Sequence, residues 1–238
     1  MERIRRPSQH SSQALARTWA GLSLLLLGCS GAEDPTGAGE VSSWPEGTVL
    51  VCAGDPIRAD EVDLIAEALK PLGPKFTEPH LRRLALTNVR LPLAAGRTQA
   101  GKNRRDQALG AAEASFRSLA EVPPGAGSDP GILTEGAQDV LGVPLWVLIQ
   151  GLESTVWTGP SELPGQFVVV KLVERDENAQ AQREQFTVRV LAFPYVDDPP
   201  SLAGEALKST LVVVDEAWGP LVPGFWRHQM GTAGDSRD

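Results

Sequence analysis

The sequence predicts an α+β fold, in which helices precede or cover a small antiparallel or mixed sheet. Three observations lead to this prediction. Apolar residues recur at helical spacing between residues 60 and 121. Runs of β-branched and aromatic residues predict strands near residues 167–174, 186–193 and 210–214. A loop rich in Gly and Pro, residues 122–131, separates the two regions. We expect the helix of residues 104–121 to cover one face of the sheet.

The predicted domain begins with a strand and a helix. Residues 48–57 form a short strand that ends in a Gly-Asp-Pro turn. The helix that follows has Asp60 as its N-cap and Asp63 at position N3, and it ends at Pro71. Its apolar positions lie on one face, as expected for a helix that packs against a core.

The remaining elements follow from the same kinds of pattern. A second helix begins at Thr77 and is limited by Pro92, and an amphipathic helix runs from Asn103 to Glu121. The later elements are, in chain order, a short helix at 143–152 with Trp146 and Ile149 inward, a turn-rich stretch at 154–165, and strands at 166–175, 186–196 and within 209–219. The aromatic residues of 221–226 are expected to pack, and the polar end of the chain to fray.

Residues 1–28 predict a secretory leader. A basic region containing Arg3, Arg5, Arg6 and Arg17 precedes an apolar segment that is too short to span a bilayer. The segment ends in Leu-Leu-Gly-Cys, which resembles the bacterial lipobox, where cleavage precedes the cysteine and the thiol is joined to diacylglycerol. We therefore expect lipidation of Cys29, whose acyl chains anchor the protein to a membrane. A cysteine within an ordinary signal peptide is the alternative.

The residue after Cys29 indicates the membrane in which a lipoprotein is expected to reside. It is Ser30, not the aspartate that retains lipoproteins at the inner membrane. By resemblance to sorting in Gram-negative bacteria, we expect an outer-membrane lipoprotein that faces the periplasm, with exposure at the cell surface as the alternative.

The tether and the net charge limit the partners. Residues 29–47 are rich in Gly, Ser, Pro and acid and predict a flexible tether, in which only Trp44 is suited to docking onto the domain. Without residues 1–28 the chain has 18 Lys plus Arg and 29 Asp plus Glu, a net charge of −11. This charge argues against nucleic acid as a partner and against electrostatic attraction to anionic lipid.

Few residues have the chemistry of a catalytic or metal site. Once His10 leaves with the leader, His80 and His228 remain, 148 positions apart, and no His or Cys spacing suits zinc. The chain has no calcium-loop pattern, phosphate-binding loop or nucleophile elbow. Cys52 is better explained as a small buried strand residue than as a nucleophile. We therefore expect no catalytic residue, no bound metal and no cofactor.

Three segments occur in an order that is typical of one family. VLVCAGDPIRADEVD (49–63) places a strand and a Gly-x-Pro-Ile turn before a helix. GVPLWVLIQGLESTVWTGP (142–160) has a Val-Pro-x-aromatic start, a helix and a Gly-Pro turn, and GQFVVVKLVER (165–175) is a strand with a charged end. Together with the GAGSDPG loop (125–131), they resemble the parvulin-type peptidyl-prolyl isomerases and the SurA-like periplasmic chaperones that contain them. The resemblance covers about residues 48–176.

The resemblance implies a degenerate member, because the histidine pair of the family is absent. The first histidine falls at Asn88 if LTNVRL (86–91) corresponds to the first parvulin strand. Alternatively, that segment is the last chaperone helix and the first strand is eroded. The second histidine falls at Phe167 or Val168. Trp146 matches the aromatic residue of the proline pocket. The resemblance therefore implies an apolar peptide groove with Trp146, Trp157, Phe167 and Asn88.

The same resemblance implies five regions. They are the lipoprotein signal peptide (1–28), the flexible tether (29–47), a SurA-like N-terminal strand and helices (48–100), a degenerate parvulin-like domain (101–176), and a C-terminal β extension with a tail (177–238).

Three functions remain open at this point. The first is a lipid-anchored, extracytoplasmic chaperone-like or peptide-binding protein without isomerase turnover, whose clients are unfolded or proline-containing polypeptides. The second is an active peptidyl-prolyl isomerase, which must lower a rotation barrier of roughly 18–20 kcal/mol. The third is a structural or docking lipoprotein of the envelope that uses the C-terminal extension.

Overall fold

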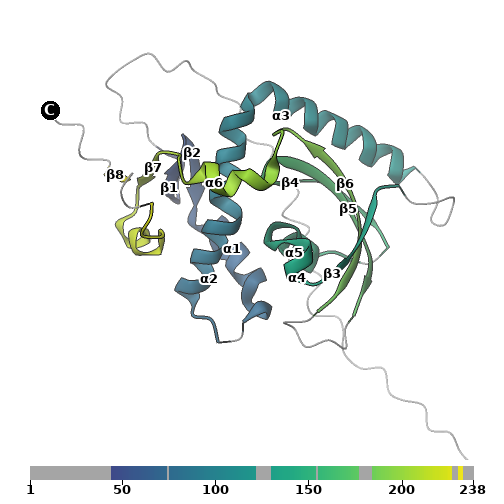
Figure 1. The fold of residues 1–238 in the computed structure, drawn as a ribbon, viewed down its shortest axis with the longest axis horizontal. Helices are drawn as coiled ribbons and strands as arrows, with labels where there is room; N and C mark the ends of the chain where they lie inside the picture. Colours follow the sequence, from purple (N-terminus) through teal and green to yellow (C-terminus); the bar gives the residue numbers. More distant parts are fainter. Residues whose placement is uncertain are drawn as a thin grey trace, which may run out of the picture. The chain divides into compact units, whose positions relative to one another are not determined.

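The structure, a computed structural model, describes residues 44–73, 75–121, 130–153, 155–176, 184–226 and 230–232. Within these residues the strands form two four-stranded sheets, and a long helix runs past both of them (Figure 1). This arrangement confirms the α+β prediction. The leader, Cys29, His228 and most of the tether lie outside the described residues.

The first sheet joins the two ends of the described chain. It has the order β2-β1-β7-β8 and is built from β1 (Thr48–Cys52), β2 (Asp55–Arg58), β7 (Leu211–Val213) and β8 (Met230–Thr232). All pairs are antiparallel except β7 with β8. Ala53 and Gly54 have φ values of 52° and 85°, the left-handed geometry of a two-residue hairpin turn. The strand predicted at the start of 48–57 is present as β1. The predicted Gly-Asp-Pro turn is wrong, because the turn lies at Ala53 and Gly54, and Asp55 and Pro56 belong to β2.

Two helices lead from the first sheet. They are α1 (Ala59–Leu69), which continues into a 3-10 turn (Lys70–Leu72), and α2 (Glu78–Ala85). The N-cap of α1 is Arg58 rather than Asp60, and the backbone N–H of Arg58 donates to the Glu61 carboxylate at 3.2 Å. Thr77 is the N-cap of α2 as predicted, although its side chain makes no capping hydrogen bond.

Pro92 does not end the second helix, contrary to the prediction. A π turn over Leu86–Arg90 joins α2 to α3 (Leu91–Ala120), and Pro92 lies in the first turn of α3. The N–H of Leu91 donates to the carbonyl of Leu86, five residues earlier. This wider turn changes the hydrogen-bond pattern just before a residue that has no N–H to donate, so the helical path continues past the proline.

The long helix α3 changes direction at Gly101. This residue has φ 69° and ψ 164°, a conformation that glycine adopts without a Cβ penalty. Figure 1 shows one half of α3 running beside α1 and α2 and the other half running along the second sheet. Ala108 and Ala112 of the second half pack against Phe167 and Val169. The prediction that residues 104–121 cover one face of the sheet is confirmed.

The second sheet is antiparallel and has the order β3-β6-β5-β4. Its strands are β3 (Ile132–Gly136), β4 (Trp157–Leu163), β5 (Gln166–Arg175) and β6 (Phe186–Pro194). The strands predicted near 167–174 and 186–193 are neighbours here, as β5 and β6. The strand predicted near 210–214 is β7 and belongs to the first sheet instead.

The stretch predicted to be rich in turns contains a strand. β4 includes Gly159 and Pro160, and its pairing with β5 shifts register between Thr158 and Ser161. A bulge at this point lets an edge strand accommodate a proline that cannot donate to the sheet.

Helix α5 lies on the face of the second sheet opposite to α3. The short helices α4 (Gln138–Leu141) and α5 (Val143–Gln150) connect β3 to β4, and Trp146 and Ile149 are buried as predicted, at 1% and 0% exposure. Pairing places Leu172 opposite Val188 and Arg175 opposite Phe186 on one face. On this face the Arg175 guanidinium donates to the carbonyls of Ile149 and Gln150, which end α5.

The C-terminal residues complete the core. A 3-10 turn (Pro199–Ser201) and α6 (Leu202–Ala206) follow β6, and a second 3-10 segment (Glu216–Leu221) follows β7. Trp226 is 2% exposed, and its indole N–H donates to the Ala206 carbonyl at 3.0 Å. The expected packing of aromatic residues in this tail is confirmed for Trp226, whereas Phe225 is 63% exposed.

Glu162 of β4 is the centre of a buried group of charges, since its side chain is 2% exposed. Its two carboxylate oxygens lie 2.7 Å from Arg97 Nη2 and 2.7 Å from Arg105 Nε. The hydroxyl of Tyr195 donates to the same carboxylate at 3.1 Å. Arg97 also reaches Asp55 of β2, at 3.1 Å. The cluster therefore joins both sheets to the two halves of α3.

The environment fixes the protonation states in this cluster. Burial opposes ionisation of Glu162, but the hydrogen bonds and charges of Arg97 and Arg105 outweigh it and hold the pKa of the carboxyl below its usual value. Burial likewise disfavours the Arg97 cation, yet the bond to Glu162 raises its pKa. Burial and then the Glu162 charge raise the pKa of Tyr195. At neutral pH Glu162 and Arg97 are therefore charged, and Tyr195 is a neutral donor.

The turn between β4 and β5 packs against its neighbours without space for a side chain. Gly165 has φ +78°, and a Cβ there would lie 2.8 Å from Leu202 Cδ1 and 3.0 Å from Pro199 Cβ. A Cβ on Gly96 of α3 would lie 3.1 Å from the Gly165 nitrogen. The helix, the turn and α6 thus meet at two glycines.

Replacing Glu162 by Gln should destabilise the protein by about 3 kcal/mol, because the mostly buried Arg97 and the partly buried Arg105 lose the charge of a buried carboxylate. Urea unfolding of the full chain, followed by circular dichroism, measures the difference. Glu113→Gln, an exposed change on α3, should stay within about 0.5 kcal/mol. A cost for Glu162→Gln below about 1 kcal/mol would contradict this role.

The Glu162 contribution should also depend on pH. The folded pKa lies below the unfolded value of about 4.3, so the stabilisation is complete above that value and is lost as pH falls through the lower folded pKa. The difference between wild type and Glu162→Gln should therefore shrink in acid. A difference that is constant down to about pH 2 would contradict the ionic explanation.

Replacing Gly165 by Ala should destabilise the protein by about 2 kcal/mol or more, from left-handed strain and from the contact with Leu202. Gly110→Ala is the matched control. It lies inside α3 with no atom within 4 Å of the added Cβ, and it should stabilise by about 0.5–1 kcal/mol. Equal effects of the two changes on the urea midpoint would contradict the packing described for the turn.

Candidate functional site

The residues expected to form an apolar groove do not lie together. Phe167 and Trp157 pack in the cluster on the α3 side of the second sheet, with Phe167 5% exposed. Trp146 is on α5, at the opposite face, and is 1% exposed. These side chains fill two separate parts of the core.

Asn88 lies in the π turn between α2 and α3. Its amide donates to the Leu84 carbonyl at 3.0 Å and to the Thr87 hydroxyl at 3.2 Å. Residues 86–91 are helical, so the alternative in which they are the first parvulin strand is wrong. The alternative in which they continue a helical segment agrees with the structure. Phe167 and Val168, the two positions for the second histidine, are both buried on β5.

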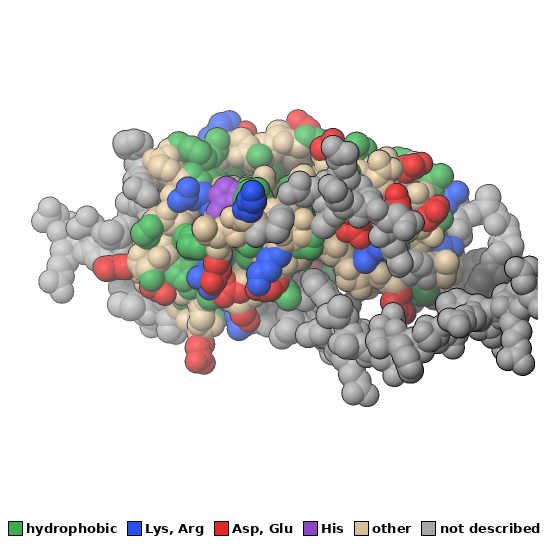
Figure 2. All heavy atoms as spheres, turned by 90° about the horizontal axis from the view of Figure 1, so that it is seen from below, with side chains coloured by type: hydrophobic (Ala, Val, Ile, Leu, Met, Phe, Trp, Pro, Cys, Tyr) green, Lys and Arg blue, Asp and Glu red, His purple; other side chains and the backbone are tan. Residues whose placement is uncertain are grey.

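His80 is exposed on α2, next to the ring of Phe76 at a centroid distance of 4.6 Å. Figure 2 shows histidine and basic side chains close together on this face, with acidic and basic groups interspersed below them. Arg82, from the same helix, pairs with Asp63 and Glu78 at 2.6 and 2.9 Å. This is a solvated, ion-paired helix surface.

Cys52 is a buried strand residue. Its exposure is 0%, and burial, reinforced by the charge of Asp55, raises the pKa of its thiol to about 11. A thiol in this state is protonated at neutral pH and is a poor nucleophile. Across the residues that the structure describes, no group of three or more His, Cys, Asp or Glu side chains is placed to hold a metal ion. The helices of this part of the chain are all too short or too polar to cross a membrane.

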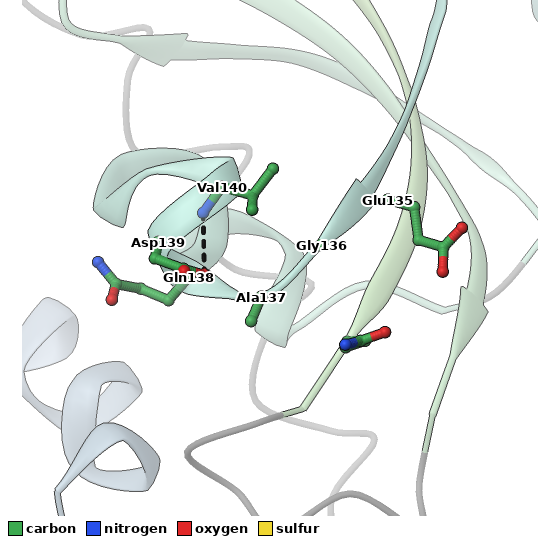
Figure 3. Close-up of a pocket in the computed structure, with 7 residues that line it drawn as sticks. Glu135, Gly136, Ala137, Gln138, Asp139 and Val140 are labelled. Atoms are coloured by element: carbon green, nitrogen blue, oxygen red, sulfur yellow. Dashed lines mark hydrogen bonds between the residues drawn. The ribbon is translucent and has the colours of Figure 1, made fainter.

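Among the described residues, the largest group of exposed large apolar side chains close together in sequence lies at β3 and α4. Ile132, Leu133 and Val140 are 74%, 52% and 61% exposed. Beside them lies an open hollow of about 630 Å³ lined by Glu135, Gly136, Ala137, Gln138, Asp139, Val140 and Gln185 (Figure 3). Gly136 permits this arrangement, because a Cβ there would lie 2.5 Å from the Val140 Cβ. We refer to β3 and α4, residues 132–141, as the β3 edge.

The backbone of β3 has one unpaired side within the described chain. β3 is the outermost strand of its sheet and pairs only with β6 there. Outside the sheet pairing, none of the hydrogen bonds between described residues involves the backbone of 132–136. Such an edge presents N–H and C=O groups that a further extended chain can bind. Exposed apolar side chains beside it add a second source of affinity.

The β3 edge was not among the predicted site residues. Ile-Leu-Thr at 132–134 has the β-branched and apolar character of a strand, and Gly131 and Gly136 bound it. This strand pattern is only five residues long, and no local sequence pattern indicates that the strand lies at the edge of a sheet. The β3 edge has backbone donors and acceptors, apolar side chains and acids, but no nucleophile beside a base. These groups are suited to binding.

Comparisons with known proteins add no further information: no family model, no curated protein and no solved structure matches the chain.

Proposed function

We propose that the chain is a lipid-anchored, extracytoplasmic peptide-binding protein of chaperone-like character, built on a parvulin-like scaffold and without isomerase turnover. Extended segments of unfolded or proline-containing polypeptides are its ligands. They bind by adding a strand along the β3 edge, where backbone hydrogen bonds supply affinity and alternate side chains supply selectivity. Cys29 carries the anchor, at the outer membrane facing the periplasm.

The observation that carries this proposal is the unpaired side of β3 with its exposed Ile132, Leu133 and Val140. Native proteins protect such edges with lysine, proline or a covering segment. β3 has no lysine or proline, and within the described residues no strand pairs with its outer side. An edge of this kind is suited to an extended polypeptide.

The order of elements also supports the scaffold. The three segments that resemble the family form a strand hairpin with a helix (β1, β2 and α1), a helix with a strand (α5 and β4), and a strand (β5). The position for the second histidine of the family holds the buried Phe167 or Val168, the segment around Asn88 is helical, and Trp146 is enclosed in the core. Turnover by the family's polar site therefore has no support among the described side chains.

Replacing Ile132 by Thr should weaken peptide binding about tenfold, which corresponds to about 1.4 kcal/mol, because part of the apolar contact is lost. Threonine retains a β-branched side chain, so the strand should persist. The full chain is placed in phosphatidylcholine nanodiscs, and fluorescence anisotropy follows an eight-residue labelled peptide with apolar residues at alternate positions. Empty nanodiscs give the background.

The matched control is Phe225→Thr, which removes another exposed apolar side chain from the C-terminal part of the fold. It should leave the affinity unchanged. If both changes weaken binding equally, or if no peptide binds, the proposed site is wrong. Acceleration of cis/trans exchange in a proline peptide, measured by exchange NMR, would instead establish an isomerase.

A further inference from the structure

We infer that the β3 edge selects extended segments that combine basic with apolar residues. This inference rests on the proposed function and names the class of ligand for the same site. The charged side chains of the β3 edge are the basis of this selectivity.

The acids of the β3 edge differ from the other acids around the core. Glu135 and Asp139 are exposed, and no Lys or Arg of the described residues forms an ion pair with either of them. Asp139 accepts a hydrogen bond from its neighbour Val140 at 3.1 Å. Elsewhere, Glu61 binds the buried Arg90 at 2.7 Å. Glu162 binds the mostly buried Arg97, also at 2.7 Å. The two acids at the edge are thus available to a cation from outside.

The register of β3 determines where the basic side chains of a bound strand would lie. Leu133 is opposite Arg189 and Glu135 is opposite Thr187 on one face, and Ile132 is opposite Val190 on the other. A strand that pairs with the outer side of β3 alternates its side chains between these two faces. The side chains on one face of the bound strand would therefore lie beside Ile132, and those on its other face would lie beside Leu133 and Glu135. Apolar residues suit the first set, and a mixture of apolar and basic residues suits the second.

A second copy of this chain is a poor occupant of the edge. Parallel in-register pairing of two β3 strands would place each Glu135 beside its own equivalent. Full antiparallel pairing would place Glu135 opposite Leu133 and make the two Glu135 side chains diagonal neighbours on one face, so both arrangements bring like charges together. The two Asp139 side chains would add to the same negative surface. The acidic edge therefore favours a different polypeptide, one that brings positive charge.

The chain's own remaining segments are also poor occupants. Under the proposed function residues 1–28 are removed before Cys29, and residues 227–229 are too few to form a strand. Residues 30–43 and 122–129 contain no Lys or Arg, and 177–183 and 233–238 contain one Arg each among polar and small residues. None of these segments alternates basic with apolar residues. The occupant that fits the edge is thus a separate, extended, basic and apolar segment.

Two labelled eight-residue peptides test the selectivity, one alternating Lys with Val and one alternating Glu with Val. Each is titrated with the full chain in phosphatidylcholine nanodiscs, whose neutral lipid adds no charge, at about 50 mM and about 500 mM salt. We expect the Lys peptide to bind at least tenfold more tightly at low salt, and the preference to shrink at high salt because the charges are exposed.

Charge-neutral variants assign the preference to the edge. The double change Glu135→Gln and Asp139→Asn should reduce the preference for the Lys peptide to about twofold or less. Glu113→Gln, an exposed change on α3, should leave it unaltered. Equal binding of the two peptides, or a preference that survives the double change, would overturn the inference.

N-methylated peptides test the geometry of binding. In a strand, alternate N–H groups point to opposite sides, so methylation of one alternate set should abolish binding and methylation of the other set should not. If both sets are harmless, strand addition is wrong and the proposed function fails. If methylation of one set abolishes binding while Lys and Glu peptides bind equally, the proposed function stands and only the selectivity fails.

Sedimentation as a dimer that Ile132→Thr dissociates would overturn the choice of occupant.

Discussion

The buried carboxylate of Glu162 is the constraint on which the arrangement of the domain depends. Its ion pairs with Arg97 and Arg105 join β4 to both halves of α3, on either side of the bend at Gly101. Arg97 extends the cluster to Asp55 in the first sheet, and Tyr195 extends it to the end of β6. An ion that is buried to this extent is tolerated only when its partners are held in place. The cluster therefore fixes the angle at which α3 passes from one sheet to the other.

This arrangement decides which surface of the second sheet remains for a ligand. The second half of α3 covers one face, through Ala108 and Ala112, and α5 covers the other, through Trp146 and Ile149. β4 is one edge strand of this sheet, and its Glu162 binds it to α3. The opposite edge of the sheet is β3, where Ile132 and the neighbouring Val140 of α4 are exposed beside acids that form no ion pair with another described residue. Within the described residues, the part of this sheet that remains for the proposed ligand is therefore an edge and not a groove between helix and sheet.

Local patterns in the sequence predict the fold class but not the site. The apolar spacing of α5 and the β-branched run of β5 are strong, and both elements are where the patterns place them. β4 was missed because Gly159 and Pro160 have the composition of a turn, whereas a bulge absorbs them. The partners of Glu162 lie 57 and 65 residues away, so no local signal shows the cluster. The edge position of β3 depends on pairing with β6, whose paired residues lie 50 to 58 positions later, and such long-range pairing is not contained in local periodicity.

Hydrogen–deuterium exchange of the full chain in neutral nanodiscs, with and without a saturating basic and apolar peptide, tests the central claim most directly. An added strand must bind the outward N–H groups of β3, so the account predicts slower exchange within residues 132–136 and little change in α5. Protection that is centred on residues 143–150 around Trp146, with β3 unchanged, would contradict the account and place the ligand in a groove of the helix-covered core.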